Sequence, residues 1–226
     1  MKNQPRSLEI ERKTAFAVFS LLAGVLTLLL VMGLFLPSTT AAQFLSTYNA
    51  NQVIYGIFGL AALLWSVFSI PFVVGLGTLL RAKSSSFALA ATILSSVGIL
   101  LLGSAFFIPQ QALGALSLVG NLAPGSAEAT YHAAFWYHFS GSLAYPAFCS
   151  WGLGQVLFGW LAWRSQVLPN WLAVLGIIGG IASFAPPIVY VQVIIFGSFI
   201  IWGVTTGILL LQSRGQEALR QTVPAP

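Results

Sequence analysis

The positions of the basic residues constrain this chain more than any other feature of its sequence. The chain has 226 residues, of which 58% are hydrophobic and 6% are charged, so it has too little polar surface for a water-soluble globule. All nine lysines and arginines lie just outside long apolar segments: Lys2, Arg6, Arg12, Lys13, Arg81, Lys83, Arg164, Arg214 and Arg220. Since a helix needs about 20 apolar residues to cross a bilayer, the sequence predicts an all-α, polytopic membrane helix bundle.

We expect one transmembrane domain over residues 14–212, between a tail at 1–13 and a tail at 213–226. Its six transmembrane helices are predicted at 14–36, 52–80, 87–108, 135–163, 170–185 and 190–212. With six spans all basic residues lie on one side, and the positive-inside rule makes that side, with both termini, cytoplasmic. A five-span chain would place Arg214 and Arg220 on the opposite side. A cleaved signal peptide is the alternative for the first segment, which is longer than a signal peptide's apolar region.

The connection at 109–134 is predicted to be an extracytoplasmic loop. Its first part, 110–119, is too short to span, which leaves an interfacial helix or a re-entrant segment as alternatives. Ser126 or Thr130 is expected to cap the helix that follows. Pro186-Pro187 should separate the last two helices, because neither proline fits inside a regular helix.

A stripe along the fourth predicted helix holds most of the chemically useful side chains. Residues spaced alternately by four and three positions lie on one helix face: His138, Ser142, Tyr145, Cys149, Gly152, Val156 and Gly159. Because polar groups in a span prefer the bundle interior, we expect this stripe, and Gln155 on the same helix, to face other helices or a ligand. The alternative is that these groups only hydrogen-bond neighbouring helices.

Catalytic and cofactor sites find little support in the sequence. The four glutamates lie in tails or a loop and Asp is absent, so no predicted span has a carboxylate or a lysine for proton transfer. His132 and His138 cannot bind one metal ion from the same regular helix, and the single Cys149 excludes a cysteine cluster. Haem bound by His138, or a serine hydrolase using His138 and Ser142, remain as weaker alternatives. We predict no metal site, no cofactor and no catalytic residue.

Small residues predict close contacts between helices. The glycines in this pattern are Gly152, Gly176, Gly180, Gly203 and Gly207. Packing within the bundle is the simplest interpretation, and a homo-oligomer or another membrane protein is the alternative partner. The lipid bilayer is an expected partner in any case, and nucleic acid is not expected to be one.

The segment from Gly159 to Gly180, GWLAWRSQVLPNWLAVLGIIGG, resembles a stretch of an uncharacterised family of six-span bacterial membrane proteins, a domain of unknown function. There too an apolar helix ends in Gly, four residues, Arg-Ser, two residues and Leu-Pro. The resemblance implies a cytoplasmic (inner) membrane setting and six spans, and it implies no activity.

These observations favour a non-enzymatic integral membrane protein that packs against a membrane partner or holds a lipid or other apolar ligand in its bundle. A small transporter or permease for a neutral or apolar substrate is the alternative. Prolines that would break helices, such as Pro71 and Pro146, support that alternative, and the lack of buried charge opposes it.

Overall fold

The computed structural model describes residues 6–33, 40–118, 126–185 and 189–222. Within these residues the chain is all-α, without a strand, and forms seven helices: α1 (Arg6–Gly33), α2 (Ala41–Ala50), α3 (Gln52–Leu80), α4 (Ser85–Leu118), α5 (Ala127–Ser165), α6 (Asn170–Ala182) and α7 (Val189–Thr222). The predicted break at Pro186-Pro187 lies outside the described residues, as do Lys2 and the part of the predicted loop at 119–125.

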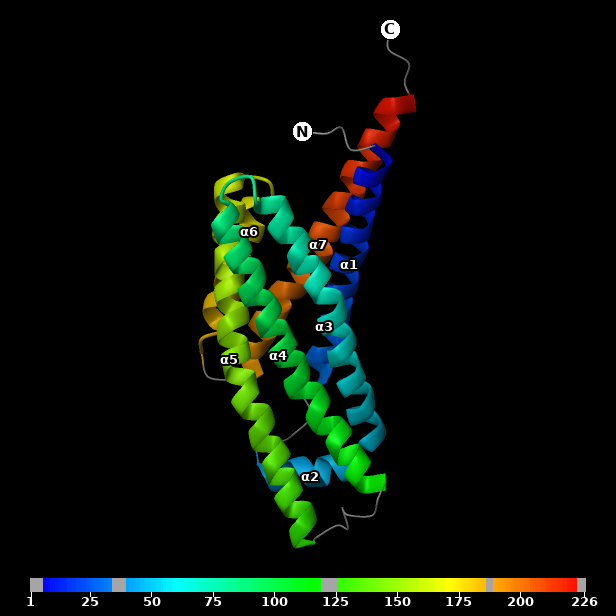
Figure 1. Ribbon diagram of the computed structural model, residues 1–226, viewed down its shortest axis with the longest axis vertical. Helices are drawn as coiled ribbons and strands as arrows, with labels where there is room; N and C mark the ends of the chain where they lie inside the picture. The colour runs from blue at the N-terminus through cyan, green and yellow to red at the C-terminus, as the bar shows by residue number, and fades with distance from the viewer. Residues whose placement is uncertain (1–5, 34–39, 119–125, 186–188, 223–226) are drawn as a thin grey trace.

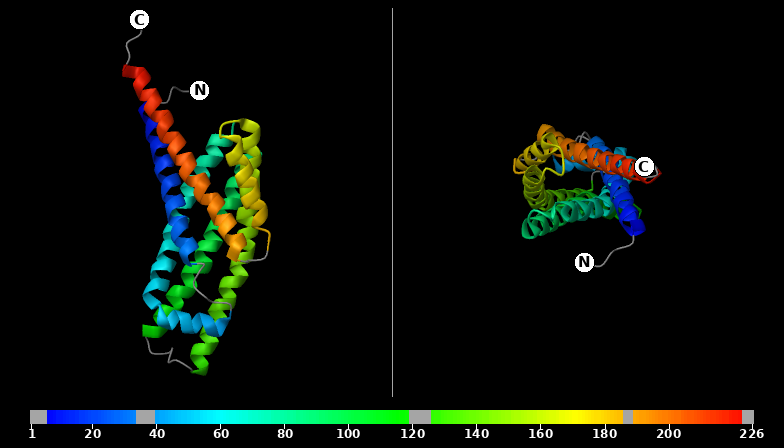
Figure 2. Two further views of the ribbon diagram at one scale, coloured as in Figure 1. Left: turned by 180° about the vertical axis from the view of Figure 1, so that it is seen from behind. Right: turned by 90° about the horizontal axis from the view of Figure 1, so that it is seen from above.

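The helices form one elongated bundle (Figure 1). α4 runs antiparallel to both α3 and α5, α1 and α7 pack side by side, and α6 lies against α5 and α7. Both termini lie at the same end of the bundle as the α3–α4 and α5–α6 turns. At the opposite end α3, α4 and α5 extend beyond α1, α6 and α7, and α2 lies across them (Figure 2).

Four of the described helices are long and apolar enough to cross a membrane: Lys13–Val31, Gln52–Leu80, Ser85–Leu116 and Val191–Gln212. α6 is apolar but has only 13 residues. α5 has 39 residues, but serine, glycine and aromatic residues lower its hydropathy. The protein is therefore embedded in a membrane, because no soluble fold would leave so many apolar side chains exposed on long helices.

Aromatic residues from three helices fill the centre of the bundle. The rings of Trp65 on α3 and Trp151 on α5 meet edge to face, with centroids 5.6 Å apart. Phe199 on α7 lies 5.1 Å from Trp151 and 5.6 Å from Phe72. Such contacts between large rings stabilise packing beyond the area that they bury, so this cluster fixes α3, α5 and α7 relative to one another.

Single hydrogen bonds join most neighbouring helices. Trp65 Nε1 on α3 donates to Thr27 Oγ1 on α1 at 2.9 Å, and Ser20 Oγ on α1 donates to the Gly203 carbonyl on α7 at 2.6 Å. Ser150 Oγ on α5 donates to the Leu94 carbonyl on α4 at 2.9 Å. These bonds satisfy polar groups that would otherwise be buried alone.

The prediction of a loop over 109–134 is wrong for most of its length. α4 continues through Pro109 to Leu118, and α5 already begins at Ala127. Residues 110–118 are thus neither a separate interfacial helix nor a re-entrant segment. Proline is tolerated inside apolar helices whose neighbours compensate for the lost bond, and Leu113 is fully buried beside α2 residues.

The short helix α2 was not predicted from the sequence. The Thr40 side chain caps it by accepting a hydrogen bond from the Gln43 N–H at 3.2 Å. Its Phe44 and Tyr48 pack on Tyr55 of α3, with ring centroids 5.9 and 5.5 Å away. α2 thus closes a small second core, which lies at the end of the bundle away from the termini.

Candidate functional site

The predicted stripe on α5 is divided between two environments. Gly152 and Gly159 are buried against α6, whereas His138, Ser142 and Tyr145 are exposed, Tyr145 by 50%. The prediction that these three residues face the bundle interior is therefore wrong. Cys149 is half-buried at the boundary.

The length of α6 explains this division. A helix of 13 residues is about 20 Å long. Just beyond its last residue, Ser183 lies against Gly152. On the N-terminal side of this contact the stripe residues Tyr145, Ser142 and His138 are exposed. In addition, Tyr145 lies about 28 Å along α5 from Arg164, close to the full thickness of a hydrocarbon core.

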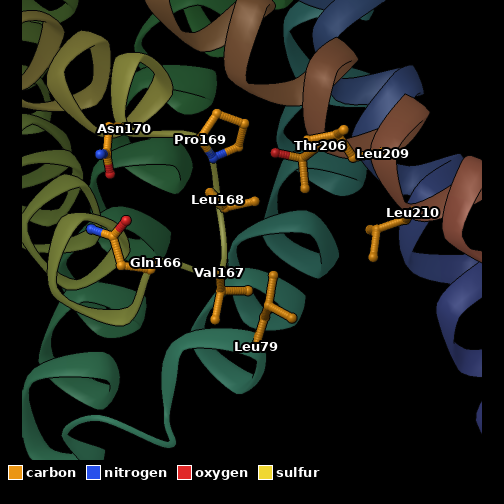
Figure 3. A pocket seen from close by; sticks show the side chains of 9 residues that line it. All are labelled: Leu79, Gln166, Val167, Leu168, Pro169, Asn170, Thr206, Leu209 and Leu210. Atoms are coloured by element: carbon orange, nitrogen blue, oxygen red, sulfur yellow. The ribbon is translucent and has the colours of Figure 1, made fainter.

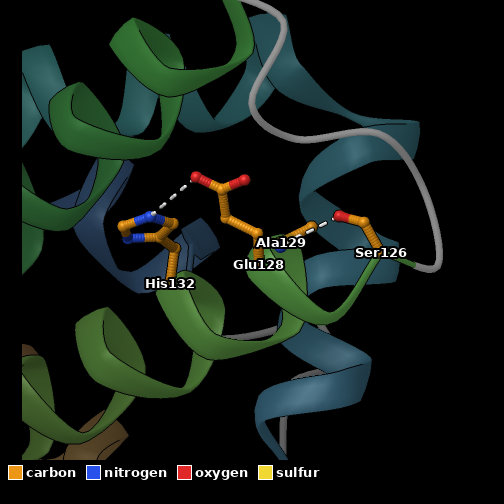
Figure 4. Close-up of polar contacts among 4 residues, drawn as sticks. All are labelled: Ser126, Glu128, Ala129 and His132. Carbon is orange, nitrogen blue, oxygen red and sulfur yellow. Dashed lines mark hydrogen bonds and ion pairs between the residues drawn. The ribbon is translucent and has the colours of Figure 1, made fainter.

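The start of α5 carries the helix cap and the histidine nearest to a carboxylate. Ser126 caps the helix by accepting a hydrogen bond from the Ala129 N–H at 3.1 Å, which confirms one of the two predicted caps. His132 Nε2 lies 3.9 Å from a Glu128 carboxylate oxygen, one turn away on the exposed surface (Figure 4). Among the described residues no three His, Cys, Asp or Glu side chains lie close enough together to hold a metal ion.

Gln155 is the one predicted ligand-facing residue that is buried and lines a cavity. This central cavity has a volume of about 10 Å³ and lies between α3, α4, α5, α6 and α7. Ser95 and Trp151 also line it, and Ser95 Oγ, Trp151 Nε1 and Gln155 Oε1 are buried without a hydrogen-bond partner in the described part of the chain. Its volume is enough for one water molecule and far too small for a lipid.

The five predicted packing glycines all lie against neighbouring helices. A methyl group at Gly152 would lie 2.6 Å from the Gly180 carbonyl oxygen, and one at Gly203 would lie 2.8 Å from the Ser20 carbonyl oxygen. Gly207 contacts α1 in the same way, and Gly176 lies against the Trp202 indole. Larger residues at these positions would force α5 from α6, α6 from α7 and α7 from α1.

A larger groove lies at the end of the bundle that carries the termini (Figure 3). It has a volume of about 480 Å³ and is formed by the α5–α6 turn, the end of α3 and one face of α7. The residues that line it are Leu79, Gln166, Val167, Leu168, Pro169, Asn170, Thr206, Leu209 and Leu210. Most of its wall is apolar, and two amides and one hydroxyl are its polar side chains.

The α5–α6 turn takes its shape from Gln166 and Pro169. Gln166 ends α5 in a left-handed conformation (φ 56°), and its N–H donates to the Ala162 carbonyl at 3.1 Å. This type of cap is most often made by glycine. Pro169 precedes α6, where its missing N–H costs no helical hydrogen bond. The chain between them, 167–168, forms one wall of the groove (Figure 3).

Thr206 is the feature of this groove that the sequence analysis missed. It is fully buried, and its Oγ1 has no hydrogen-bond partner among the described residues. Figure 3 shows this hydroxyl directed toward Pro169, across the inner end of the groove. Hydroxyl side chains are common in apolar transmembrane helices, so the sequence carries no signal that Thr206 lines a groove. Only the fold shows this position.

The side chains that line the groove are apolar or neutral polar. Its lining side chains hold no group that titrates near neutral pH. Positive charge lies nearby in sequence, since Arg81 follows Leu79 and Arg164 precedes Gln166 by two residues. Arg164 lies over the Trp160 ring, 5.2 Å from its centroid, an arrangement that holds a cation at a membrane interface.

Comparisons with known proteins give one result. No curated protein and no solved structure is significantly similar to this chain. Residues 15–212, which include the groove and all but the first two residues of the four long apolar segments, match the family described as "Domain of unknown function (DUF4386)". The chain therefore belongs to the DUF4386 family.

Proposed function

We propose that this protein crosses the bacterial inner membrane six times, with both termini in the cytoplasm. The two crossings beyond the four long apolar helices are α5 and the short α6, which is followed by the chain leading into α7. Lys13, Arg81 and Arg164 belong to helices or turns at the end of the bundle that carries the termini. Placing this end in the cytoplasm agrees with the positive-inside rule.

Cysteine mapping tests this topology. In a Cys149→Ser background, single cysteines at Lys83 and Gln216 should react with a membrane-impermeant maleimide only after the inner face is opened. A cysteine at Glu128 should react in intact cells. Reaction of the Lys83 and Gln216 cysteines on opposite sides would contradict six spans.

We further propose that the protein is non-enzymatic and holds a membrane lipid in the groove at its cytoplasmic end. The observation that carries this proposal is the groove itself, with apolar walls, a volume of about 480 Å³ and the buried, unpartnered Thr206 hydroxyl at its inner end. Small-ligand sites usually occupy about 300–1,000 Å³ and combine apolar walls with few polar groups. The central cavity is too small to hold a lipid, so the predicted apolar ligand is assigned to the groove.

The site suits an amphipathic molecule. Leu79, Leu209 and Leu210 offer apolar contacts for acyl chains, while the Gln166 and Asn170 amides can hydrogen-bond ester or headgroup oxygens. Burial of each methylene of an acyl chain is worth about 0.8 kcal/mol relative to water. The surrounding bilayer is as apolar as the groove, so apolar contacts alone do not favour the bound position. The two amides and the hydroxyl must therefore supply the preference of a lipid for the groove over the bilayer.

A groove-filling variant tests the proposal. Val167→Trp places an indole at the groove, and Ile178→Trp places one on the exposed face of α6 outside it. Lipids retained by the purified protein are counted by native mass spectrometry in mild detergent. We expect Val167→Trp to lower the number of retained lipids and Ile178→Trp to leave it unchanged. Equal retention by both variants would refute a lipid site in the groove.

A second candidate function is packing against a membrane partner or a second copy of the chain, and an exposed face of α5 favours it. His138, Ser142 and Tyr145 form an exposed face with polar groups on α5. A photo-crosslinker at Ser142 should then capture a defined product in membranes, whereas one at Val67 on the exposed face of α3 should not. Two of the proline positions that favoured the transporter alternative no longer support it, since α3 and α5 continue through Pro71 and Pro146, while Pro186-Pro187 lies outside the described residues.

A further inference from the structure

A row of interior side chains on α7 leads from the groove toward the centre of the bundle. Ser198, Trp202 and Thr206 follow one another at intervals of four residues and share one helix face. Thr206 lines the groove, and Trp202 lines the central cavity. Ser198 lies further inward, where Gly179 of α6 contacts its hydroxyl and lies near Gln155 Oε1.

α3 also has one residue at the groove and another at the central cavity. Leu79 lines the groove, and Leu76, one turn earlier, lines the central cavity. Successive turns of a helix are about 5.4 Å apart. The groove and the central cavity are thus separated by one helical turn on both α3 and α7, which is about the thickness of one side-chain layer.

Trp202 belongs to this separating layer. It is 5% exposed, and its ring lies against Gly176 of α6. Its Nε1 donates a hydrogen bond to the Leu172 carbonyl at 2.5 Å. The position of the ring therefore depends on one hydrogen bond and on the absence of a side chain at Gly176.

The cavity behind Trp202 carries the chemistry of a small hydrogen-bonding site. Trp151 Nε1 can only donate, Gln155 Oε1 can only accept, and Ser95 Oγ can do both. All three atoms are buried, and none has a partner in the described part of the chain. Leaving such groups unpaired in an apolar interior is costly, and about 10 Å³ is the space of a single water molecule.

We propose that Ser95, Trp151 and Gln155 form a binding site for one water molecule, and that the water exchanges with the groove when the Trp202 indole moves aside. The inference uses the groove of the proposed function but does not depend on which molecule occupies it. Trp202 then acts as a barrier between the groove and a polar site deep in the bundle. A structure of the full chain at high resolution should show the water within hydrogen-bonding distance of Gln155 Oε1. If Gln155 Oε1 instead accepts a bond from Ser198 or another side chain with no water beside it, the proposed water site is refuted.

Cysteine labelling tests the barrier. Val73 lines the central cavity and is buried, and Val167 lines the groove and is exposed. With Cys149→Ser as background, Val73→Cys should resist methyl methanethiosulfonate, whereas Val167→Cys should react readily. Adding Trp202→Phe keeps most of the ring but removes the bond to Leu172. The added Trp202→Phe substitution should speed the reaction at Val73→Cys about fivefold. Losing one hydrogen bond of about 1 kcal/mol raises the population of the open state by this factor.

Trp202→Ala should open the cavity further and speed the reaction by more than an order of magnitude, since buried groups react at the rate at which the structure exposes them. Trp65→Ala is the matched control, because Trp65 is an equally buried tryptophan that lines neither space. If Trp65→Ala speeds the reaction at Val73→Cys as much as Trp202→Ala, or if neither Trp202 variant does, the barrier is refuted. Lipid retention by Val167→Trp is measured separately. The two experiments can therefore refute the lipid site and the barrier independently of each other.

Discussion

Gly152→Ala provides a direct test of the contact between α5 and the end of α6. In the native structure Gly152 lies directly against Ser183 and Gly180. An added methyl group would contact the Ser183 Cβ and would lie 2.6 Å from the Gly180 carbonyl oxygen. Because the second neighbour is backbone, it cannot rotate away, and the two helices must separate.

The expected loss of stability follows from two opposing terms. Forcing a methyl group into a filled contact costs about 1–3 kcal/mol. Replacing glycine by alanine inside a helix returns about 0.5–1 kcal/mol of backbone free energy. Since backbone atoms form the obstruction, we expect a net loss in the free energy of unfolding of about 1–2 kcal/mol, or roughly a tenfold change in the unfolding equilibrium constant.

Gly141→Ala is the matched control on the same helix. A methyl group at Gly141 would meet no atom within 4 Å. Only the gain from replacing glycine by alanine in a helix then remains, and the variant should be as stable as the native protein or slightly more stable. Both variants are unfolded reversibly with sodium dodecyl sulfate in mixed micelles, and helix content is followed by circular dichroism. Equal stability of the two variants would refute the close contact between α5 and α6.

Three further predictions concern other parts of the bundle. Thr27→Val leaves the buried Trp65 N–H without its partner at 2.9 Å, and the free energy of unfolding in the same assay should fall by about 1–3 kcal/mol; an unchanged value would contradict the bond. Burial raises the pKa of Tyr48 above 10.0, so its contribution to stability is complete below that pH and is lost as pH rises through the raised pKa. Unfolding measured between about pH 8 and about pH 12 should therefore show a smaller alkaline loss in Tyr48→Phe than in the native protein. His138→Ala should change stability by less than about 0.5 kcal/mol, because the side chain is exposed, and a larger loss would show that it has a partner.

The long apolar helices could be predicted because the signal is strong and local. α3 occupies the residues 52–80 expected from its apolar run between Asn51 and Arg81. Basic residues marked the α3–α4 turn at Arg81 and Lys83 and the end of α5 at Arg164, since a lysine or arginine inside a span is costly. Helix α2 was missed because its Phe44 and Tyr48 acquire a buried face only when α3 and α5 lie beneath them, and an uncharged polar segment carries no sign of that neighbour.

Proline did not end the helices in which it occurs. The sequence predicts a helix end at 108, just before Pro109, yet α4 continues through it, and Pro71 and Pro146 also lie inside helices. In water an internal proline costs about 3 kcal/mol. Within a packed apolar bundle the tertiary contacts of the following turn, such as those of the buried Leu113, offset much of that cost.

The candidate site was predictable only in part, because periodicity shows which residues share a face but not what covers it. The stripe on α5 is continuous in sequence, but the 13 residues of α6 cover only its C-terminal half. The same short helix brings the α5–α6 turn to the groove and sets Gly176 against Trp202. The groove and the proposed barrier at Trp202 therefore both depend on α6. An insertion of one helical turn into α6 shifts its residues by about 5.4 Å and should alter both together.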